Sequence, residues 1–416
     1  MILEQYSIGV GDRFAHQGAA QLRALQEAQS NGVTIVPVWN KSYREHSIVG
    51  TNPANARAAA DKAVAECGWK NSYYVDADHI GLKNVDLFLD SSNFFTLDVA
   101  DYIGKLAEEK EIEAFVNSMS KYLSAFPMSG VRTTTKVTEA DLLAIGRKYL
   151  FAVQEAGRIY RHIAAQKGVD HFVAEVSTDE ANEPQTPAQL FFILAALAHE
   201  GVKVQTIAPK FTGSFLKGID YVGSVEAFST EFDEDLIVIA HAVKTFDLPK
   251  NLKLSVHSGS DKFSLYPVIH RALKKHNAGL HLKTAGTTWL EELIGLAMAG
   301  GPGLDTAKQI YVNAYNRIDE LCKPYETVIN IDRAKLPDPR TVMSWTSEEY
   351  ASALRHNQKD PRYNLHFRQL LHVGYKVAAE MGDRYLQMLK DSKEIIGKNV
   401  NENLFDRHIL PIFIGR

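Results

Sequence analysis

Short β-like runs that alternate with amphipathic helical segments are the feature of this 416-residue chain that most constrains its fold. Several of the runs are rich in Val, Ile, Tyr and Phe, a composition typical of buried parallel strands. The segments between them carry apolar residues at spacings of three and four, which predicts helices that bury one face. The expected strands span residues 6–10, 34–38, 73–75, 94–97, 172–176, 204–208, 252–256 and 279–282.

This alternation predicts an α/β protein with a (β/α)8 TIM barrel. A doubly wound open sheet has the same order of strands and helices and is the alternative. Residues 1–288 are expected to form the barrel, with an inserted helical cap at about residues 100–168. Residues 289–416 are almost entirely helical in pattern and are expected to form a C-terminal helical extension packed on the barrel.

Composition excludes several classes of partner. The 46 Lys and Arg residues against 50 Asp and Glu give a formal charge of −4, so neither nucleic acid nor an anionic membrane is an expected partner. The longest apolar stretch, residues 190–198, falls well short of the roughly 20 residues that span a bilayer. Only two cysteines occur, Cys67 and Cys322, which favours a reducing compartment. We therefore expect a cytoplasmic enzyme, and a homo-oligomer is compatible with the sequence.

Polar clusters follow five of the eight expected strands. In a barrel, the carboxyl ends of the strands and the loops after them carry the catalytic residues. These clusters therefore predict one active site at that end of the barrel. They comprise residues 11–14, 76–79, 175–180, 257–262 and 283–289.

Asp78, His79 and His257 have the composition of a metal site. Imidazole nitrogens bind divalent metals, and a neighbouring carboxylate can act as a ligand, orient a histidine or move a proton. His79 and His257 follow strands that lie across the barrel from each other. Two histidines and a carboxylate suit Zn, Mn, Ni, Co or Fe. The alternative is that each histidine is a hydrogen-bonded core residue.

Other polar residues predict substrate contacts less specifically. Ser258 and Ser260 can offer amides and hydroxyls to a phosphate or carboxylate, although an ordinary strand-to-helix turn explains them equally well. The glycines at 9 and 11 lack the third glycine of a dinucleotide fingerprint. Arg355 and its neighbours predict either a polar lid or a solvated helix face.

Locally, the chain resembles the metal-dependent class II aldolases. The resemblance rests on Asp78-His79, on Glu175, on the His-Ser-Gly-Ser run at 257–260 and on the Lys-Thr-x-x-Thr-x-Trp run at 283–289. It implies that His79 and His257 hold a divalent metal and that Asp78 transfers a proton. The sixth expected strand lacks the further histidine of those aldolases. Glu175 is therefore our choice for the third ligand, with Gln205 in reserve.

Globally, the chain resembles the tagaturonate/fructuronate epimerase family. This resemblance runs through residues 7–14, 76–79, 257–262, 283–292 and 355–357. It implies a metal-dependent isomerase that interconverts two hexuronate ketoses in hexuronate catabolism, with a small sugar acid as its partner. The two ketoses differ at a carbon β to the ketone, where direct deprotonation is prohibitive. Retro-aldol cleavage and re-addition would invert that carbon, with a Lewis-acidic metal stabilising the enediolate.

The resemblance leads to these expected roles. Asp78 is the general base or acid, and Glu175, if it is not a ligand, is the complementary acid. Arg13, Lys262 or Arg355 would pair with the substrate carboxylate. Three alternatives stay open: transient oxidation of the β-hydroxyl, an aldolase-like sugar lyase, and a non-catalytic barrel that accompanies a catalytic aldolase.

Overall fold

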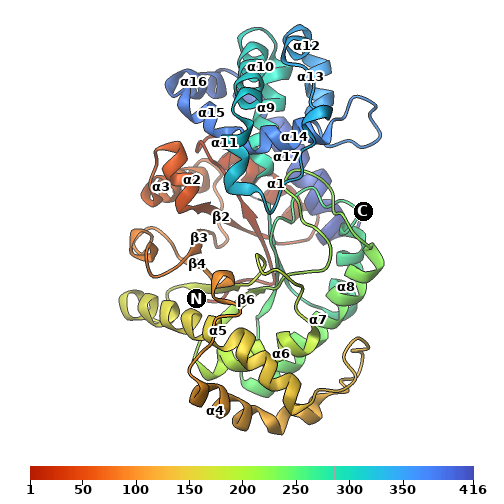
Figure 1. Cartoon of the computed structure of the whole chain (residues 1–416). Coiled ribbons are helices and arrows are strands. Elements are labelled where there is room, and N and C mark those ends of the chain that lie inside the picture. The colour runs from red at the N-terminus through yellow and green to blue at the C-terminus, as the bar shows by residue number, and fades with distance from the viewer. Residues whose placement is uncertain (285) are drawn as a thin grey trace.

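A closed barrel of parallel strands forms the centre of the protein (Figure 1). The computed structural model describes residues 1–284 and 286–416. Within these residues every strand pairs with its sequence neighbours, and β1 also pairs with β8. Closure excludes the open sheet and confirms the predicted (β/α)8 barrel. The strands are β1 (Tyr6–Val10), β2 (Val36–Ser42), β3 (Tyr74–Ile80), β4 (Phe94–Asp98), β5 (Val173–Ser177), β6 (Val204–Ala208), β7 (Lys253–Val256) and β8 (Leu280–Lys283).

Most strand bounds agree with the expected runs to within one residue, but β2 and β3 end later than expected. Strand β2 spans Val36–Ser42, against the expected 34–38. Strands β1 and β6 coincide with the runs at 6–10 and 204–208. Strand β3 continues through Asp76, Asp78 and His79 to Ile80, five residues beyond the expected end. A polar sequence remains a strand here because the side chains that face the barrel interior find partners there. The cluster at 76–79 is thus part of the strand and does not follow it.

Six helices cover most of the barrel's outer surface. Helix α6 is apolar on nearly all sides because α5 and α7 pack against it. Side chains of Asn52 and Thr186 cap the N-termini of α3 and α6, and a proline follows each cap, an arrangement that favours helix initiation. These helices are α1 (Gly18–Ser30), α3 (Pro53–Cys67), α5 (Glu139–Lys167), α6 (Pro187–His199), α7 (Val225–Phe246) and α8 (Tyr266–His276).

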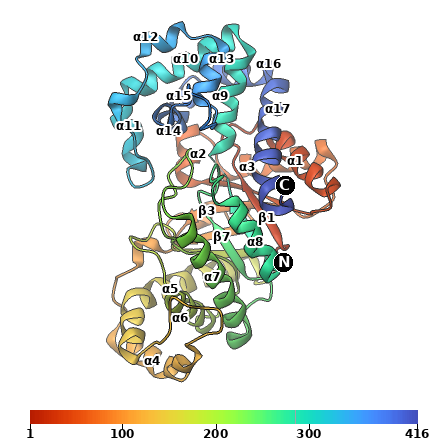
Figure 2. The same cartoon turned by 90° about the vertical axis from the view of Figure 1, so that its right-hand side faces the viewer.

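The long connection between β4 and β5 carries α4 (Glu109–Met119) and the short 3₁₀ segments η2 (Ala100–Tyr102) and η3 (Ser120–Ala125) before α5. Helix α4 buries Ile112, Phe115 and Met119 and contacts α5 and α6. It therefore lies outside the ring of barrel helices, at the end of the molecule opposite the C-terminal helices (Figure 2).

A second helical region follows β8 and has its own hydrophobic core. Helix α9 is its centre and contacts α10, α13 and α17 most extensively. No helix among the described residues is both long and apolar enough to cross a bilayer. The helices of this region are α9 (Thr287–Ala299), α10 (Gly301–Asn316), α11 (Ile318–Cys322), α12 (Pro339–Ser344), α13 (Ser347–Leu354), α14 (Leu365–Val373), α15 (Tyr375–Glu380), α16 (Asp383–Asp391) and α17 (Lys393–Leu404).

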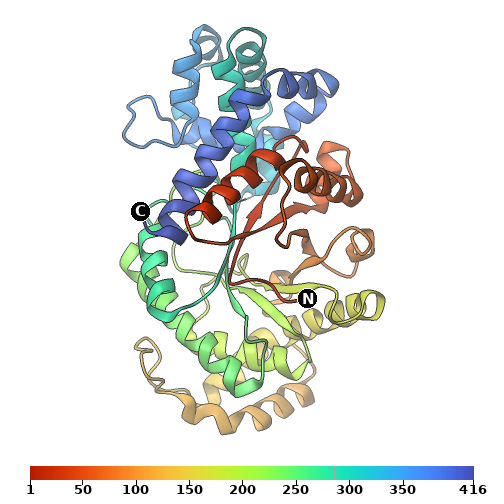
Figure 3. The same cartoon turned by 180° about the vertical axis from the view of Figure 1, so that it is seen from behind.

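The end of the chain returns to the barrel. The π-helical segment η6 (Phe405–Ile414) contacts both α8 and α1. Its Ile409 and Ile412 are fully buried in the barrel's hydrophobic core, and the Phe413 ring lies 5.2 Å from that of Tyr6. Seen from behind, the last helices lie alongside α1 (Figure 3). The C-terminal segment thus fills the outer position between α8 and α1, while α9 leads away from the barrel.

At the amino ends of the strands the barrel holds an apolar cluster beside the buried polar residues Gln205 and Lys253, and at the carboxyl ends it holds a dense group of charged side chains. Leu3, Val36, Val38, Tyr74, Phe94 and Val173 form a small buried cluster that closes the amino end. Above this cluster, Asp76, Thr96, Glu175 and Lys283 are all buried inside the barrel. Buried charges need partners, so this distribution places the polar chemistry of the chain at the mouth.

Candidate active site

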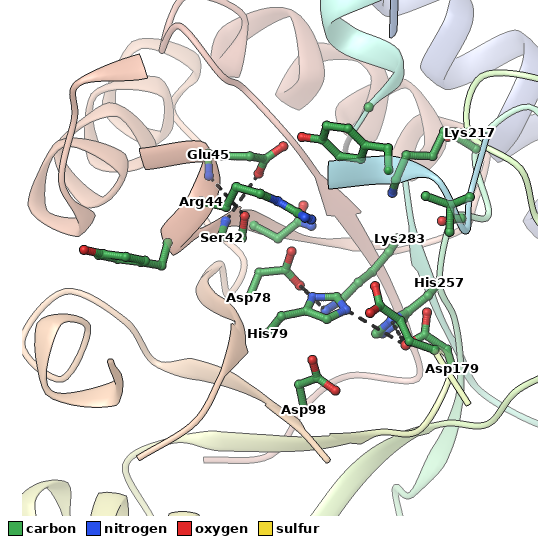
Figure 4. A pocket seen from close by; sticks show the side chains of 18 of the residues that line it. Ser42, Arg44, Glu45, Asp78, His79, Asp98, Asp179, Lys217, His257 and Lys283 are labelled. Carbon is green, nitrogen blue, oxygen red and sulfur yellow. Dashed lines mark hydrogen bonds and ion pairs between the residues drawn. The ribbon is translucent and has the colours of Figure 1, made fainter. Parts of the chain in front are cut away.

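A cavity of about 370 Å³ opens at the carboxyl ends of the strands (Figure 4). Its walls come from the barrel strands and the loops that follow them, from the short helix α2 (Tyr43–Val49), from α14 and from the segment after α11. The barrel and the C-terminal helical region therefore both line it. The lining residues are Arg13, Asn40, Ser42, Tyr43, Arg44, Glu45, Asp78, His79, Asn84, Asp98, Asp179, Glu180, Lys217, His257, Ser258, Ser260, Lys283, Gly286, Tyr325, Val328 and His372.

Asp78 and His79 both line this cavity although they are consecutive in a strand. Consecutive strand residues normally point to opposite faces. Here the β3–β4 register shifts between Ala77 and Ile80, and His79 adopts φ of +54°. Such irregularities concentrate at functional sites. The local distortion turns both side chains to the mouth.

The two predicted histidines converge, and an aspartate joins them. The rings of His79 and His257 lie 5.4 Å apart. One ligand atom each from His79, Asp179 and His257 lies within 4.8 Å of the others. His257 Nδ1 is buried without a hydrogen bond, although Asp179 Oδ1 is 3.1 Å away. Two imidazoles and a carboxylate are a suitable donor set for a divalent transition metal, so these residues fit such an ion.

Each histidine is held from behind by another carboxylate. His79 Nδ1 lies 2.9 Å from Asp78 Oδ1, and His257 Nε2 lies 2.7 Å from Glu175 Oε1. These contacts leave His79 Nε2, 3.9 Å from Asp179 Oδ1, and His257 Nδ1 facing the centre of the cluster. Metal-binding histidines are commonly oriented by a carboxylate in this way.

The cluster attracts positive charge. Burial alone lowers the pKa of His79, but Asp78, and to a lesser degree Asp179, outweigh burial and raise it to about 10. Burial also lowers the pKa of His257, while Asp179 and Glu175 raise it to about 9. The same carboxylates that favour a proton on each ring favour a cation between the rings.

Lys283 links the carboxylates beneath the cavity. Its Nζ lies 2.9 Å from Asp78 Oδ1, 2.9 Å from Glu175 Oε1 and 3.0 Å from Asp76 Oδ2. Burial lowers the pKa of Lys283, but the three carboxylates raise it well above its usual value, so the side chain is an ammonium. Gly9 leaves room for it, because a Cβ at Gly9 would lie 2.9 Å from Lys283 Cγ.

The opposite wall of the cavity is cationic. Arg13 Nε contacts Glu45 Oε1 at 3.0 Å, and its guanidinium lies 4.1 Å from the centre of the Tyr375 ring. Arg44 lies over the Tyr325 ring and donates to the Pro324 carbonyl. Lys217 extends towards the cavity beside them (Figure 4). The cavity is therefore acidic and histidine-rich on one side and basic on the other.

The structure places the predicted site residues in two groups. Asp78, His79, His257, Arg13, Ser258 and Ser260 line the cavity, whereas Glu175 is fully buried beneath it. Lys262 donates to the carbonyls of Leu216, Ile219 and Ser260. Arg355 contacts Asn399 and Met298 in the C-terminal region, away from the cavity. In the run at 283–289, Ala285 lies outside the described residues.

Gln205, the reserve ligand, is at the other end of the barrel. It accepts from the Leu3 amide and donates to the Met1 carbonyl, near the amino end of β1. Gln205 is the second residue of β6, so it lies near the amino end of that strand. This position rules out a contact with the two histidines.

Comparison with known proteins fits this architecture. The sequence profile of the tagaturonate epimerase family (UxaE) matches residues 1–409. The chain belongs to the tagaturonate epimerase family. It is therefore an isomerase, a carbohydrate epimerase, and the epimerase resemblance seen in its motifs is confirmed.

Relatives of known activity and structure cover nearly the whole chain. The tagaturonate/fructuronate epimerase of Thermotoga maritima is 27% identical over 419 residues, which covers 97% of this chain and 80% of that protein. A glycerol complex of the fructuronate-tagaturonate epimerase UxaE from Cohnella laeviribosi superposes with a TM-score of 0.81 at 24% identity, covering 99% of this chain and 82% of that one. Its native crystal structure gives a TM-score of 0.80. These likenesses confirm the fold.

Sequence reasoning gave no role to Asp179, Lys283 or Lys217. Asp179 belongs to the polar cluster after the fifth strand, and a carboxylate two residues beyond the end of β5 was an available signal. A lysine at the last position of β8 was another, because a lysine inside a barrel requires carboxylate partners.

Proposed function

We propose that this enzyme interconverts D-tagaturonate and D-fructuronate with the help of a divalent metal ion. Family membership supports the substrate pair. The observation that carries the metal dependence is the convergence of His79 Nε2, His257 Nδ1 and the Asp179 carboxylate at the mouth of the barrel. The basic wall opposite suits the carboxylate of a sugar acid.

We propose Asp179 as the third ligand and assign Glu175 to a positioning role. Glu175 Oε1 accepts hydrogen bonds from His257 Nε2 and Thr96 Oγ1 and also contacts Lys283. Oε1 is therefore fully engaged, while Oε2 is buried without a hydrogen bond among the described residues. The assignment rests on position, because the Glu175 side chain does not line the cavity. Asp179 does line it and faces both rings. Its Oδ1 lies 3.1 Å from His257 Nδ1 and 3.9 Å from His79 Nε2, so the three side chains could hold a divalent ion with only small movements.

When bound, a divalent ion at these residues supplies Lewis-acid stabilisation of the negative charge that develops on the ketone oxygen. The chain's own residues do the rest. Glu175 orients His257, and Asp78 orients His79. Lys283 contacts both carboxylates and fixes their positions. Arg13 is already ordered by Glu45 and Tyr375, so it can meet a carboxylate or hydroxyl of the substrate with little loss of side-chain entropy.

Asp78 is the proposed proton-transfer residue. Oδ1 receives both of its recorded hydrogen bonds, from His79 and Lys283, which leaves Oδ2 to take a proton. Burial raises the pKa of Asp78, but His79 and Lys283 outweigh burial and hold it well below its usual value. The carboxylate is thus ionised at the cavity wall and can accept a proton, but its lowered pKa makes it a weaker base than an ordinary aspartate.

Retro-aldol chemistry suits this arrangement. Asp78 takes the proton of the β-hydroxyl, and the bond between the α- and β-carbons breaks. Its electron pair forms the C=C bond of an enediolate, whose negative charge lies on the former ketone oxygen. The aldehyde fragment rotates, the bond re-forms on its other face, and Asp78 returns the proton. The proposed reaction takes place in the cavity of about 370 Å³, whose walls from the barrel and from the C-terminal helical region help to retain both fragments. Ser258 and Ser260, at the cavity edge, are the proposed hydroxyl contacts.

The direct test is product analysis by NMR after incubation of metal-stripped and metal-reloaded enzyme with D-tagaturonate. We expect D-fructuronate only in the reloaded sample. Release of a trappable free aldehyde would instead indicate a lyase, and absence of both metal binding and turnover would indicate a non-catalytic barrel. Tightly bound nicotinamide in the purified enzyme would favour transient oxidation.

Two isosteric variants separate a ligand from a neighbouring acid. Asp179→Asn should lose both bound metal and turnover, because an amide is a much weaker ligand than a carboxylate. Glu180→Gln changes the adjacent cavity-lining acid and should keep the metal. Metal content per chain, measured after dialysis, distinguishes them. Normal metal content in Asp179→Asn would contradict the assignment of Asp179.

A further inference from the structure

The geometry points to Lys217 as the residue that anchors the carboxylate of the substrate and selects sugar acids over neutral sugars. This inference rests on the proposed function and identifies the anion-binding part of the same site. Lys217 lies in the loop between β6 and α7, on the wall of the cavity that also holds Arg13 and Arg44. Sequence reasoning assigned it no role.

Lys217 differs from the other non-histidine cations of the cavity in having no recorded side-chain partner among the described residues. Arg13 is paired with Glu45, and Lys283 is surrounded by three carboxylates. Arg44 lies on the Tyr325 ring and donates to a carbonyl. No hydrogen bond or ion pair of the Lys217 ammonium is found in the part of the chain that the structure describes. Figure 4 shows this side chain directed into the cavity.

The backbone around Lys217 is held by two buried cations. Lys262 Nζ donates to the carbonyls of Leu216 and Ile219, and Arg368 Nε donates to the carbonyl of Gly218. Both cations are almost fully buried, at 1% and 0% exposure. Three of the four carbonyl groups from Leu216 to Ile219 are fixed in this way. The loop therefore presents its lysine from a rigid base.

The C-terminal helical region supplies the remaining support. The Lys217 amide donates to the Val328 carbonyl at 2.8 Å, and Gln369 Nε2 donates to the Lys217 carbonyl at 3.4 Å. Arg368 in turn is anchored to Asp261 at 2.6 Å and to the Leu354 carbonyl at 2.7 Å. The helical region therefore has a specific task at the site, which is to hold this loop over the barrel mouth.

The charges around Lys217 favour an anion. Burial lowers the pKa of Lys217, as do Arg13 and Arg44, while Glu45 and Glu180 raise it. Of those two carboxylates, Glu45 is already committed to Arg13. An incoming carboxylate would relieve the repulsion among the three cations and give the Lys217 ammonium the charged hydrogen bond that it lacks. The acidic, histidine-rich side of the cavity would then receive the ketone end of the sugar.

The test is calorimetric binding of D-tagaturonate and of D-tagatose, in which a hydroxymethyl group replaces the carboxylate. Lys217→Met removes the charge and keeps the length of the side chain. We expect it to weaken D-tagaturonate binding by about 10- to 100-fold, the range of one charged hydrogen bond, and to change D-tagatose binding less than about twofold. Lys217→Arg should recover most of the D-tagaturonate affinity.

Lys210→Met is the matched control. Lys210 lines the neighbouring cavity of about 880 Å³, which adjoins the site at Asp179 and His257. The Lys210→Met variant removes a lysine charge near the site. It should leave the affinities for D-tagaturonate and D-tagatose within about twofold of those of the wild type. Equal weakening of both sugars by Lys217→Met, or unchanged D-tagaturonate binding, would overturn the inference. Binding that follows the expected pattern without any turnover by the wild type would refute the proposed reaction and leave the role of Lys217 standing.

Discussion

Replacing Lys283 by methionine tests whether this lysine balances the charges inside the barrel. Its ammonium contacts Asp76, Asp78 and Glu175, all within 3.0 Å. Lys283 and the three acids are buried. Lys283→Met retains the length and apolar volume of the side chain and leaves three converging carboxylates without a cation. The expected result is a large loss of stability without a steric change.

The magnitude follows from the number and burial of the unpaired acids. Removing one partner of a buried ion pair costs about 3–5 kcal/mol. Burial, Asp78 and Glu175 raise the pKa of Asp76 to about 7 even with Lys283 present. The folded variant can therefore relieve repulsion by protonating Asp76. The folded state then binds more protons than the unfolded state, so its stability falls as pH rises. We expect a cost near 3 kcal/mol at pH 6 and near 5 kcal/mol at pH 8.

Urea unfolding of chelator-treated enzyme, followed by the fluorescence of its four tryptophans, measures this cost. Lys308→Met is the matched control, because Lys308 is also buried but donates only to the Met343 carbonyl; it should cost about 1 kcal/mol. Adding Asp76→Asn to Lys283→Met should restore about 1–2 kcal/mol, because the two sites are coupled. A loss below 1 kcal/mol in Lys283→Met at both pH values would refute the charge-balance argument.

Two further predictions concern proton transfer and pH. Asp78→Asn should keep the metal, because His79, His257 and Asp179 remain. Its turnover should fall at least about 100-fold, because the base is lost. Normal turnover would show that Asp78 does not transfer the proton. Burial raises the pKa of Glu231 to about 7, so its neutral form stabilises the fold at low pH and that contribution is lost between about pH 4.5 and 7. In urea unfolding, the stability of Glu231→Gln should therefore equal that of the wild type at pH 5 and exceed it by about 1–2 kcal/mol at pH 8. An equal difference in stability at both pH values would contradict the buried-acid explanation.

The barrel was predictable from the sequence because its strands are short apolar runs separated by helices with a clear period. The predicted strand bounds were wrong where polar side chains of the site continue a strand. Strand β3 continues through Asp76, Asp78 and His79 because Lys283, about 200 residues later in the last barrel strand, supplies the compensating charge. A strand rule based on apolar residues cannot anticipate such a distant partner.

The sequence pattern also could not predict which segment completes the ring of helices around the barrel. A helix directly after β8 was the natural candidate, yet η6 at the end of the chain occupies the position beside α1 and α8. Helical periodicity identifies a buried face but not the surface against which it packs. The extension predicted at 289–416 therefore contributes its final segment to the barrel itself.

Whether a predicted site residue reaches the mouth of the barrel depends on its position along its strand. His257 directly follows the last residue of β7 and reaches the cavity, whereas Gln205 is near the start of β6 and lies at the opposite end. Asp179 and Lys217 lie in loops, whose course depends on contacts with the rest of the molecule. Burial of Glu175 beneath His257 likewise depends on the three-dimensional arrangement.

The most direct test of the central claim is an anomalous-diffraction map of crystals of the metal-loaded enzyme. The account predicts a single strong peak per chain within about 2.5 Å of His79 Nε2, His257 Nδ1 and a carboxylate oxygen of Asp179, and loss of this peak in Asp179→Asn. A peak bound elsewhere, or a fully active crystal without a peak between the two histidines, would contradict it.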